Sequence, residues 1–80
     1  MIIYGTDQCP DCVACKKDLD QSGVPYEYRD ISSNLLHLKE FLALRDTNGI
    51  FEPVKQEGRI GIPAIVSQEV VSLSWDAFIK

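Results

Sequence analysis

Short apolar runs and helix-like stripes of apolar residues alternate along this chain. Met1–Tyr4 is a run too short for a helix and suits a strand that is buried on both faces. Val24–Ile31 contains a proline and then mixes aromatic and charged residues, as a partly exposed strand does. The runs Ile62–Val66 and Val70–Leu73 are separated by a short polar turn, which indicates an antiparallel hairpin. The pattern therefore predicts four strands.

Periodic apolar positions predict a first helix from Pro10 to about Gln21. On this helix Cys12, Cys15 and Leu19 share one apolar stripe. Gly23 follows the helix and is a good C-terminal cap, because glycine adopts the left-handed conformation readily.

A second helix is expected after Ser32 or Ser33, since serine is a favoured N-cap. We expect it to end in a left-handed turn at Asn48-Gly49. Its expected core stripe consists of leucines at helical spacing, widened by neighbouring apolar residues: Leu35, Leu38 and Leu42, then Leu36, Phe41 and Leu44. A third, short helix is predicted over Trp75–Lys80, with Ser74 as its cap and its aromatic side chains on the sheet.

The predicted order of elements is β-α-β-α-β-β-α, so residues 1–80 should form one α/β domain with a four-stranded mixed sheet flanked by helices. A right-handed crossover makes the first two strands parallel. The segment Ile50–Gly61 shows no periodicity and is expected to be a long loop, either a substrate-facing flap or an irregular connector.

Composition narrows the classes of partner. A net charge of -4 argues against a nucleic-acid partner, because phosphate binding requires clustered lysine and arginine. The chain does not open with the basic and apolar regions of a signal peptide, and no run approaches the roughly 20 apolar residues of a membrane span. We therefore expect a cytoplasmic protein that binds neither nucleic acid nor a membrane.

Two thiols lie between the first strand and the first helix, in the motif Cys9-Pro10-Asp11-Cys12. In a regular helix, β-carbons three residues apart are separated by about 5–6 Å, whereas a disulfide needs about 3.5–4.5 Å. Cys9 must therefore cap the helix, and Pro10 is favoured at the next position. There, free N–H groups and the helix dipole stabilise a thiolate. In this context the motif favours redox chemistry over a chance pair of buried cysteines.

Cys15 and His37 have simpler interpretations. On a regular helix Cys15 lies about 120° around and roughly 9 Å along the axis from Cys9, so we expect a small buried core residue there. His37 lies at the edge of the stripe of the second helix, and we expect a surface or half-buried histidine.

The chain resembles the glutaredoxins of the thioredoxin-like superfamily over most of its length. The likeness is carried by the opening strand, Cys9-Pro10-Asp11-Cys12, Lys16, Leu19, Gly23-Val24-Pro25-Tyr26, Asp30-Ile31 and Gly61-Ile62-Pro63. The resemblance implies a thioredoxin-like fold with a cis peptide bond before Pro63. It also places Ile62 and Pro63 against the cysteines, where the backbone of Ile62 can pair with an extended thiol substrate.

By this resemblance the protein is a thiol–disulfide oxidoreductase that reduces protein disulfides or glutathione mixed disulfides. Cys9 attacks the substrate disulfide, and Cys12 then displaces the reduced substrate and leaves a Cys9–Cys12 disulfide. No bound cofactor is expected. Glutathione is the candidate co-substrate, and either glutathione or thioredoxin reductase is the candidate reductant.

Three features differ from the usual family pattern. Asp11 stands where the family has tyrosine, and its carboxylate should oppose ionisation of Cys9. The basic residue that often precedes the first cysteine is absent from Thr6–Gln8, and the paired glycines and acidic residue after the last strands are absent from Gln68–Ser74. Asp76 is the candidate replacement as a glutathione contact. The resemblance therefore favours thiol–disulfide exchange more than it favours glutathione as the electron source.

Two other classes of function stay open at this point. Cys9, Cys12 and Cys15 form C-x2-C-x2-C, which suits an iron–sulfur or zinc module. Such a module needs a further ligand, either His37 or a second protomer that shares a cluster through Cys9 and glutathione. The other class is a thioredoxin-like interaction domain whose thiols are incidental.

Overall fold

The computed structural model describes residues 1–79. Its elements in chain order are β1 (Ile2–Gly5), α1 (Pro10–Gln21), β2 (Glu27–Asp30), α2 (Leu35–Thr47), the 3-10 turn η1 (Gly49–Phe51), α3 (Glu52–Gln56), β3 (Ala64–Ser67), β4 (Val70–Ser72) and the 3-10 turn η2 (Asp76–Phe78). Within these residues, no helix is long and apolar enough to cross a membrane.

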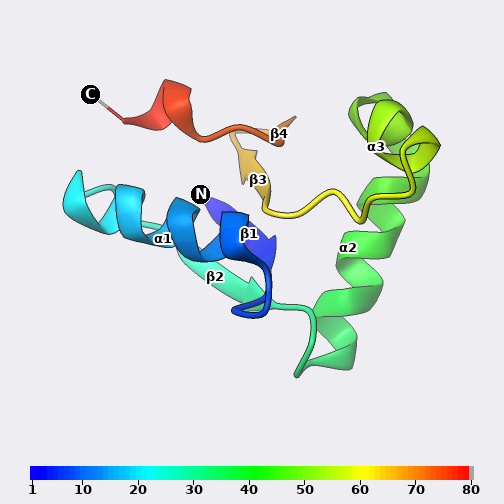
Figure 1. Ribbon diagram of the computed structural model, residues 1–80, viewed down its shortest axis with the longest axis horizontal. Helices are drawn as coiled ribbons and strands as arrows, with labels where there is room; N and C mark the ends of the chain where they lie inside the picture. Colours follow the sequence, from blue (N-terminus) through cyan, green and yellow to red (C-terminus); the bar gives the residue numbers. More distant parts are fainter. Residues whose placement is uncertain (80) are drawn as a thin grey trace.

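The four strands form one mixed sheet in the order β2-β1-β3-β4 (Figure 1). β1 pairs in parallel with β2 and antiparallel with β3, which pairs antiparallel with β4. Gln68 and Glu69 join β3 to β4 with φ angles of 51° and 66°, as the two central residues of a tight hairpin turn require. The expected mixed sheet, parallel first pair and C-terminal hairpin are confirmed.

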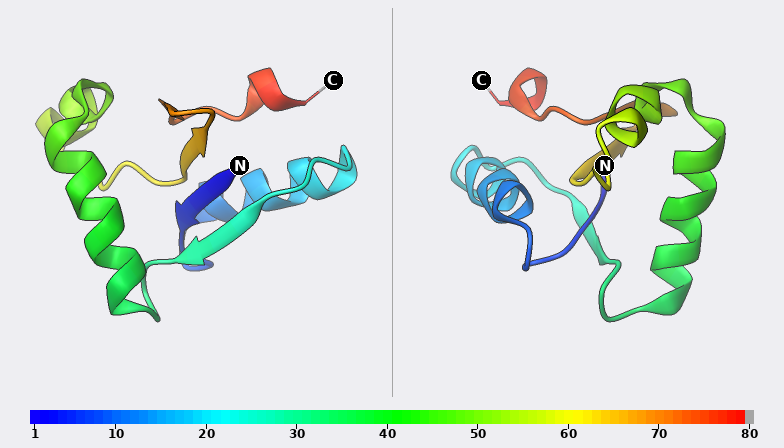
Figure 2. Two further views of the ribbon diagram at one scale, coloured as in Figure 1. Left: turned by 180° about the vertical axis from the view of Figure 1, so that it is seen from behind. Right: turned by 45° about the vertical axis from the view of Figure 1, so that its right-hand side comes forward.

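Helices cover both faces of the sheet (Figure 2). On one face, α1 packs through a buried cluster of four residues, with η2 residues packed beside it: Ile3, Cys15, Leu19 and Ile65. On the other face, α2 and α3 pack through a second cluster: Tyr4, Phe41, Phe51, Val54 and Ala64. Neighbouring strand residues such as Ile3 and Tyr4 point into different clusters, because successive side chains of a strand alternate between faces. This α/β arrangement agrees with the thioredoxin-like fold expected from the sequence.

The core stripe expected for α2 is wrong in part, because Phe41 and Leu44 pack in the core as expected but several of the leucines do not. Phe41 is fully buried, whereas Leu35 and Leu36 are 67% and 63% exposed and Leu42 is also exposed. The Phe41 ring lies 6.3 Å from that of Tyr4 and 5.9 Å from that of Phe51, centroid to centroid, so the largest side chain of α2 occupies the inward face. Apolar residues surround much of this helix, and periodicity alone does not distinguish two adjacent stripes.

The N-cap expected for α2 is also wrong, and the helix ends at Asn48 as expected but without the expected left-handed turn. The N-cap is Asn34, whose side-chain oxygen accepts a hydrogen bond from the His37 amide at 3.1 Å. Neither Ser32 nor Ser33 caps the helix. Ser32 instead donates from its amide to the Asp30 carboxylate at 2.7 Å. Asn48 is extended, with φ -100° and ψ 124°, and caps η1 in place of a left-handed turn. Asparagine is a favoured cap at both places because its side chain satisfies a free amide.

The prediction of a long loop at Ile50–Gly61 is also wrong, because most of this segment is helical. η1 and α3 occupy its first half, and Phe51 and Val54 are buried against the sheet. Pro53 lies in the first turn of α3, where its missing N–H needs no partner. Only the stretch after α3 is irregular, and it leads directly into β3.

The predicted C-terminal helix is reduced to the single turn η2, and Lys80 lies outside the described residues. Ser74 is not its cap; the Ser74 amide donates to the Ser72 hydroxyl at 3.1 Å. Trp75 does pack in the cluster beneath α1, and its indole N–H also donates to Asp18 at 2.9 Å.

The burial of Phe41 yields a direct test. Truncating Phe41 to alanine should lower the free energy of unfolding by about 3–5 kcal/mol, because it opens a cavity between Tyr4 and Phe51. The matched variant Leu35→Ala should change it by no more than about 0.5 kcal/mol. Urea denaturation of both variants measures the difference. Equal losses in the two variants would contradict the observed orientation of α2.

Candidate active site

Cys9 occupies the position of the N-cap of α1. Its backbone is extended, with φ -100° and ψ 119°, and its carbonyl accepts the first bond of the helix from the Val13 amide at 3.1 Å. Its own amide donates to the Thr6 carbonyl at 3.1 Å, which closes the loop after β1. Pro10 follows as the first helical residue, so the expected cap is confirmed. The Cys9 side chain is half-buried and therefore open to a reactant.

Cys12 lies in the first turn of α1 and is fully buried. Burial raises the pKa of its thiol to about 12; a backbone hydrogen bond from Thr6 opposes this, and Cys9 and Cys15 add to it. Cys9 is among these causes because its thiol lies close to that of Cys12. The first thiol is thus accessible, and the second is held protonated beneath it.

Gly5 makes room for Cys12 at the end of β1. A β-carbon at position 5 would lie 2.8 Å from the Cys12 sulfur and 3.0 Å from the Tyr28 hydroxyl oxygen. Such separations are shorter than side chains tolerate, so any larger residue would push α1 away from the sheet. Glycine is required here for close approach and not for an unusual backbone angle.

Cys15 is a core residue, as expected. It is fully buried in the cluster with Ile3, Leu19 and Ile65, and burial, followed by the nearby Asp18, raises its pKa to about 11. Within residues 1–79, no three Cys, His, Asp or Glu side chains converge as ligands of one metal ion would. The geometry of these residues therefore gives no support to a site formed by the three cysteines with His37.

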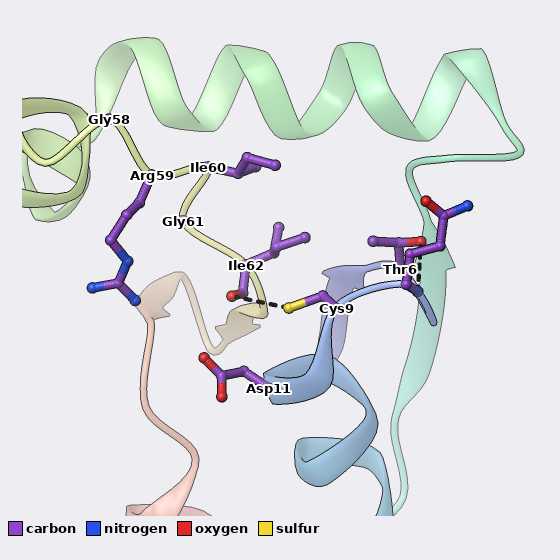
Figure 3. A pocket seen from close by; sticks show the side chains of 9 residues that line it. Thr6, Cys9, Asp11, Gly58, Arg59, Ile60, Gly61 and Ile62 are labelled. Carbon is purple, nitrogen blue, oxygen red and sulfur yellow. Dashed lines mark hydrogen bonds between the residues drawn. The ribbon is translucent and has the colours of Figure 1, made fainter.

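A pocket of about 420 Å³ opens beside Cys9 (Figure 3). The loop before α1 and the start of α1 form one wall, and the irregular stretch before β3 forms the other: Thr6, Gln8, Cys9 and Asp11, then Gly58, Arg59, Ile60, Gly61 and Ile62. The Cys9 thiol donates to the Ile62 carbonyl across the pocket, with 4.0 Å between sulfur and oxygen. The pocket therefore presents the accessible thiol next to a free length of backbone.

Helix α2 holds the pocket wall that contains Ile62 in place. Arg45 of α2 donates from its Nε and Nη2 atoms to the carbonyls of Ile60 and Arg59, each at 2.8 Å. Gly61 has φ +94° and packs closely against Phe51. A β-carbon at position 61 would lie 2.8 Å from the Cδ1 atom of Phe51. The Ile62–Pro63 peptide bond is cis, as the resemblance implied. Helix α2 thereby positions the backbone that faces Cys9.

Arg59 is a pocket residue that the sequence did not single out. Among the described residues that line the pocket it is the one cation, and Figure 3 shows its guanidinium on the same side as the Asp11 carboxylate. The wall with Thr6 and Gln8 carries no cation, so the positive charge comes from the opposite wall. In the sequence, only its position four residues before Pro63 indicates that Arg59 could lie near the cysteines.

Asp76, the expected glutathione contact, is exposed in η2 and is not among the residues that line this pocket. Its role stays a prediction. The effect of Asp11 on Cys9 also stays a prediction, although Asp11 is exposed and does line the pocket beside that thiol.

Fold and site together define a thioredoxin-like protein with a half-buried thiol at a helix N-terminus. The sequence profile of the glutaredoxins matches residues 1–71, and the chain belongs to the glutaredoxin family, a family of thiol oxidoreductases. A protein of Haemophilus influenzae described as uncharacterized is 37% identical over 65 residues, which make up 81% of this chain and 76% of that protein. No solved structure matches the chain.

The burial of the three thiols predicts very different reactivities. Iodoacetamide at neutral pH should label Cys9 alone in the reduced native protein, because Cys12 and Cys15 are buried and protonated. Mass spectrometry with and without denaturant counts the labels. Rapid labelling of Cys12 without denaturant would contradict the geometry.

The same pKa shifts fix the sign of a pH effect on stability. The folded-state values of about 12 and 11 lie above the unfolded thiol value, so above that value the folded protein holds protons that the unfolded chain has lost. The reduced protein should therefore lose stability as pH rises from about 8.5.

Proposed function

We propose that this protein is a dithiol oxidoreductase that reduces protein disulfides or glutathione mixed disulfides through Cys9 and Cys12. The observation that carries the proposal is the difference in exposure between two neighbouring thiols at the start of α1. Cys9 lies half-buried at the pocket, and Cys12 lies fully buried one turn further along α1. An attacking thiol needs access to substrate, and a resolving thiol needs access only to the first.

The reaction proceeds in two exchanges. The Cys9 thiolate attacks one sulfur of the substrate disulfide; a Cys9–substrate disulfide forms, and the other sulfur leaves as a thiolate. Cys12 then attacks the Cys9 sulfur, a Cys9–Cys12 disulfide forms, and the second substrate sulfur leaves. The substrate has gained two electrons and the cysteine pair has lost two. A reductant, glutathione or thioredoxin reductase, restores the two thiols.

The free backbone at Ile62 supports the binding of an extended substrate. Ile62 precedes β3 and pairs with no strand of the described residues, and its carbonyl faces Cys9. An extended segment on either side of a disulfide can bond to such a backbone as an added strand, independently of its sequence. This mode of binding suits a protein that acts on more than one disulfide.

Arg59 supports a preference for substrates that carry a carboxylate. It lines the pocket that contains Cys9, its side chain is 59% exposed, and it forms a surface ion pair with Glu57 at 3.6 Å. Arginine binds carboxylates through paired N–H groups. A glutathione mixed disulfide provides such carboxylates, so we propose glutathione as a co-substrate with Arg59 as one of its contacts.

The central test compares cysteine variants in the reduction of a model protein disulfide, with glutathione and thioredoxin reductase supplied separately. Cys9→Ser should abolish reduction with either reductant. Cys12→Ser should accumulate a stable Cys9–substrate disulfide, visible as an added mass. Cys15→Ala, the matched control, should retain activity because that thiol only packs in the core. Activity that survives Cys9→Ser would overturn the proposal and favour an interaction domain with incidental thiols.

The role of Arg59 is tested by replacing it with a shorter, uncharged polar side chain. Arg59→Gln should raise the KM for a glutathione mixed disulfide about threefold to tenfold, the range for a partly exposed charged hydrogen bond. It should leave kcat, and the KM for an uncharged small disulfide, unchanged. Lys17→Gln removes an exposed charge from α1 outside the pocket and is the control. The same KM in both variants would contradict a carboxylate contact at Arg59.

A further inference from the structure

Tyr28 is a buried polar residue beside the thiols that the two exchanges above do not use. It lies in β2 and pairs with Ile3 of β1. Its hydroxyl oxygen is buried and has no hydrogen-bond partner within residues 1–79. Buried hydroxyls without partners are rare because they lose their bonds to water and gain none in return. An unpaired hydroxyl in this position therefore calls for a functional explanation.

The hydroxyl of Tyr28 and the sulfur of Cys12 border the same small space. A β-carbon on Gly5 would lie 3.0 Å from the first atom and 2.8 Å from the second, so both atoms border the space that a side chain at position 5 would fill. The Tyr28 ring is held in place by Lys16, whose Nζ atom lies 4.1 Å from the ring centroid. Lys16 is itself paired with Asp7.

We propose that the Tyr28 hydroxyl donates a hydrogen bond to the Cys12 sulfur when that thiol ionises to resolve the mixed disulfide. Tyr28 is then a positioning residue for the second exchange, and the inference rests on the proposed dithiol function. The first exchange, at Cys9, does not depend on it.

The proton balance explains why a neutral donor is suited to this step. Cys12 gives its proton to water, its thiolate attacks the Cys9 sulfur, and the departing substrate thiolate takes a proton from water. Tyr28 neither gains nor loses a proton. Burial, and then the neighbouring Cys12, raise the pKa of Tyr28, so the hydroxyl remains a donor while the thiolate is present. The backbone of Thr6, which lowers the pKa of Cys12, favours the thiolate in the same way.

The surrounding charges make such a donor valuable. The titratable and charged groups that face Cys12 and Tyr28 come from the loop before α1, from α1 and from the end of β2: Asp7 and Cys9, Cys15 and Lys16, and Asp30. Two of these are carboxylates, which oppose a thiolate, and the single cation is already paired with Asp7. A hydroxyl stabilises the thiolate without adding charge to this site.

The test compares Tyr28→Phe with Tyr26→Phe. Both changes remove one hydroxyl from the same segment and keep the ring, but the Tyr26 hydroxyl donates to Asp20 at 2.8 Å and does not border the Cys12 sulfur. Rapid mixing with a chromogenic disulfide separates mixed-disulfide formation from its resolution. Tyr28→Phe should leave the first rate unchanged and slow the second roughly tenfold at neutral pH, as loss of a bond to a charged group does.

The pH profile gives a readout that a structural defect would not produce. The resolution rate rises with pH as Cys12 ionises, and in Tyr28→Phe this rise should be displaced to higher pH, whereas in Tyr26→Phe it should follow the native curve. Equal resolution rates and equal profiles in the two variants would overturn the inference while leaving the dithiol function intact. A slowing of both exchanges alike would also overturn it. If the native protein forms no Cys9–Cys12 disulfide, the proposed function itself fails, and the inference fails with it.

Discussion

The close contact between Gly5 and Cys12 is the constraint on which the site depends. The Cys12 sulfur would lie only 2.8 Å from a β-carbon at position 5, so the first turn of α1 rests directly on the end of β1. With that turn fixed, Cys12 is sealed against the sheet while Cys9, one turn earlier, reaches the surface. The difference in exposure between the two thiols follows from this one contact, and burial disfavours the ionised form of Cys12.

The two cores, one on each face of the sheet, hold different parts of the site in place. The cluster beneath α1 fixes the cysteines, and the cluster beneath α2 fixes the backbone that faces them, through the contact of Gly61 with Phe51 and the two hydrogen bonds from Arg45. In the proposed reaction, the attacking thiol and the backbone that binds the substrate are therefore anchored by cores on opposite faces of one sheet. Such independent support keeps the reacting groups in place before substrate arrives.

Features governed by local chemistry were predictable from the sequence, whereas features governed by packing were not. The bounds of α1 and the cap at Cys9 follow from the proline, the thiol spacing and the terminal glycine, and the structure confirms them. The inward face of α2 depends on how Phe41 fits between rings from other elements, and leucine spacing does not encode that fit. Tyr28 comes beside Cys12 only through the strand register that pairs it with Ile3.

The measurement that tests the account most directly is the identification of the disulfide formed on oxidation. The reduced protein is treated with one equivalent of a disulfide substrate, free thiols are blocked, and the linked peptides are identified by mass spectrometry after digestion. The account predicts a Cys9–Cys12 link with Cys15 recovered as a blocked thiol. A link from either residue to Cys15, or between two chains, would contradict the arrangement of an exposed nucleophile above a buried resolving thiol.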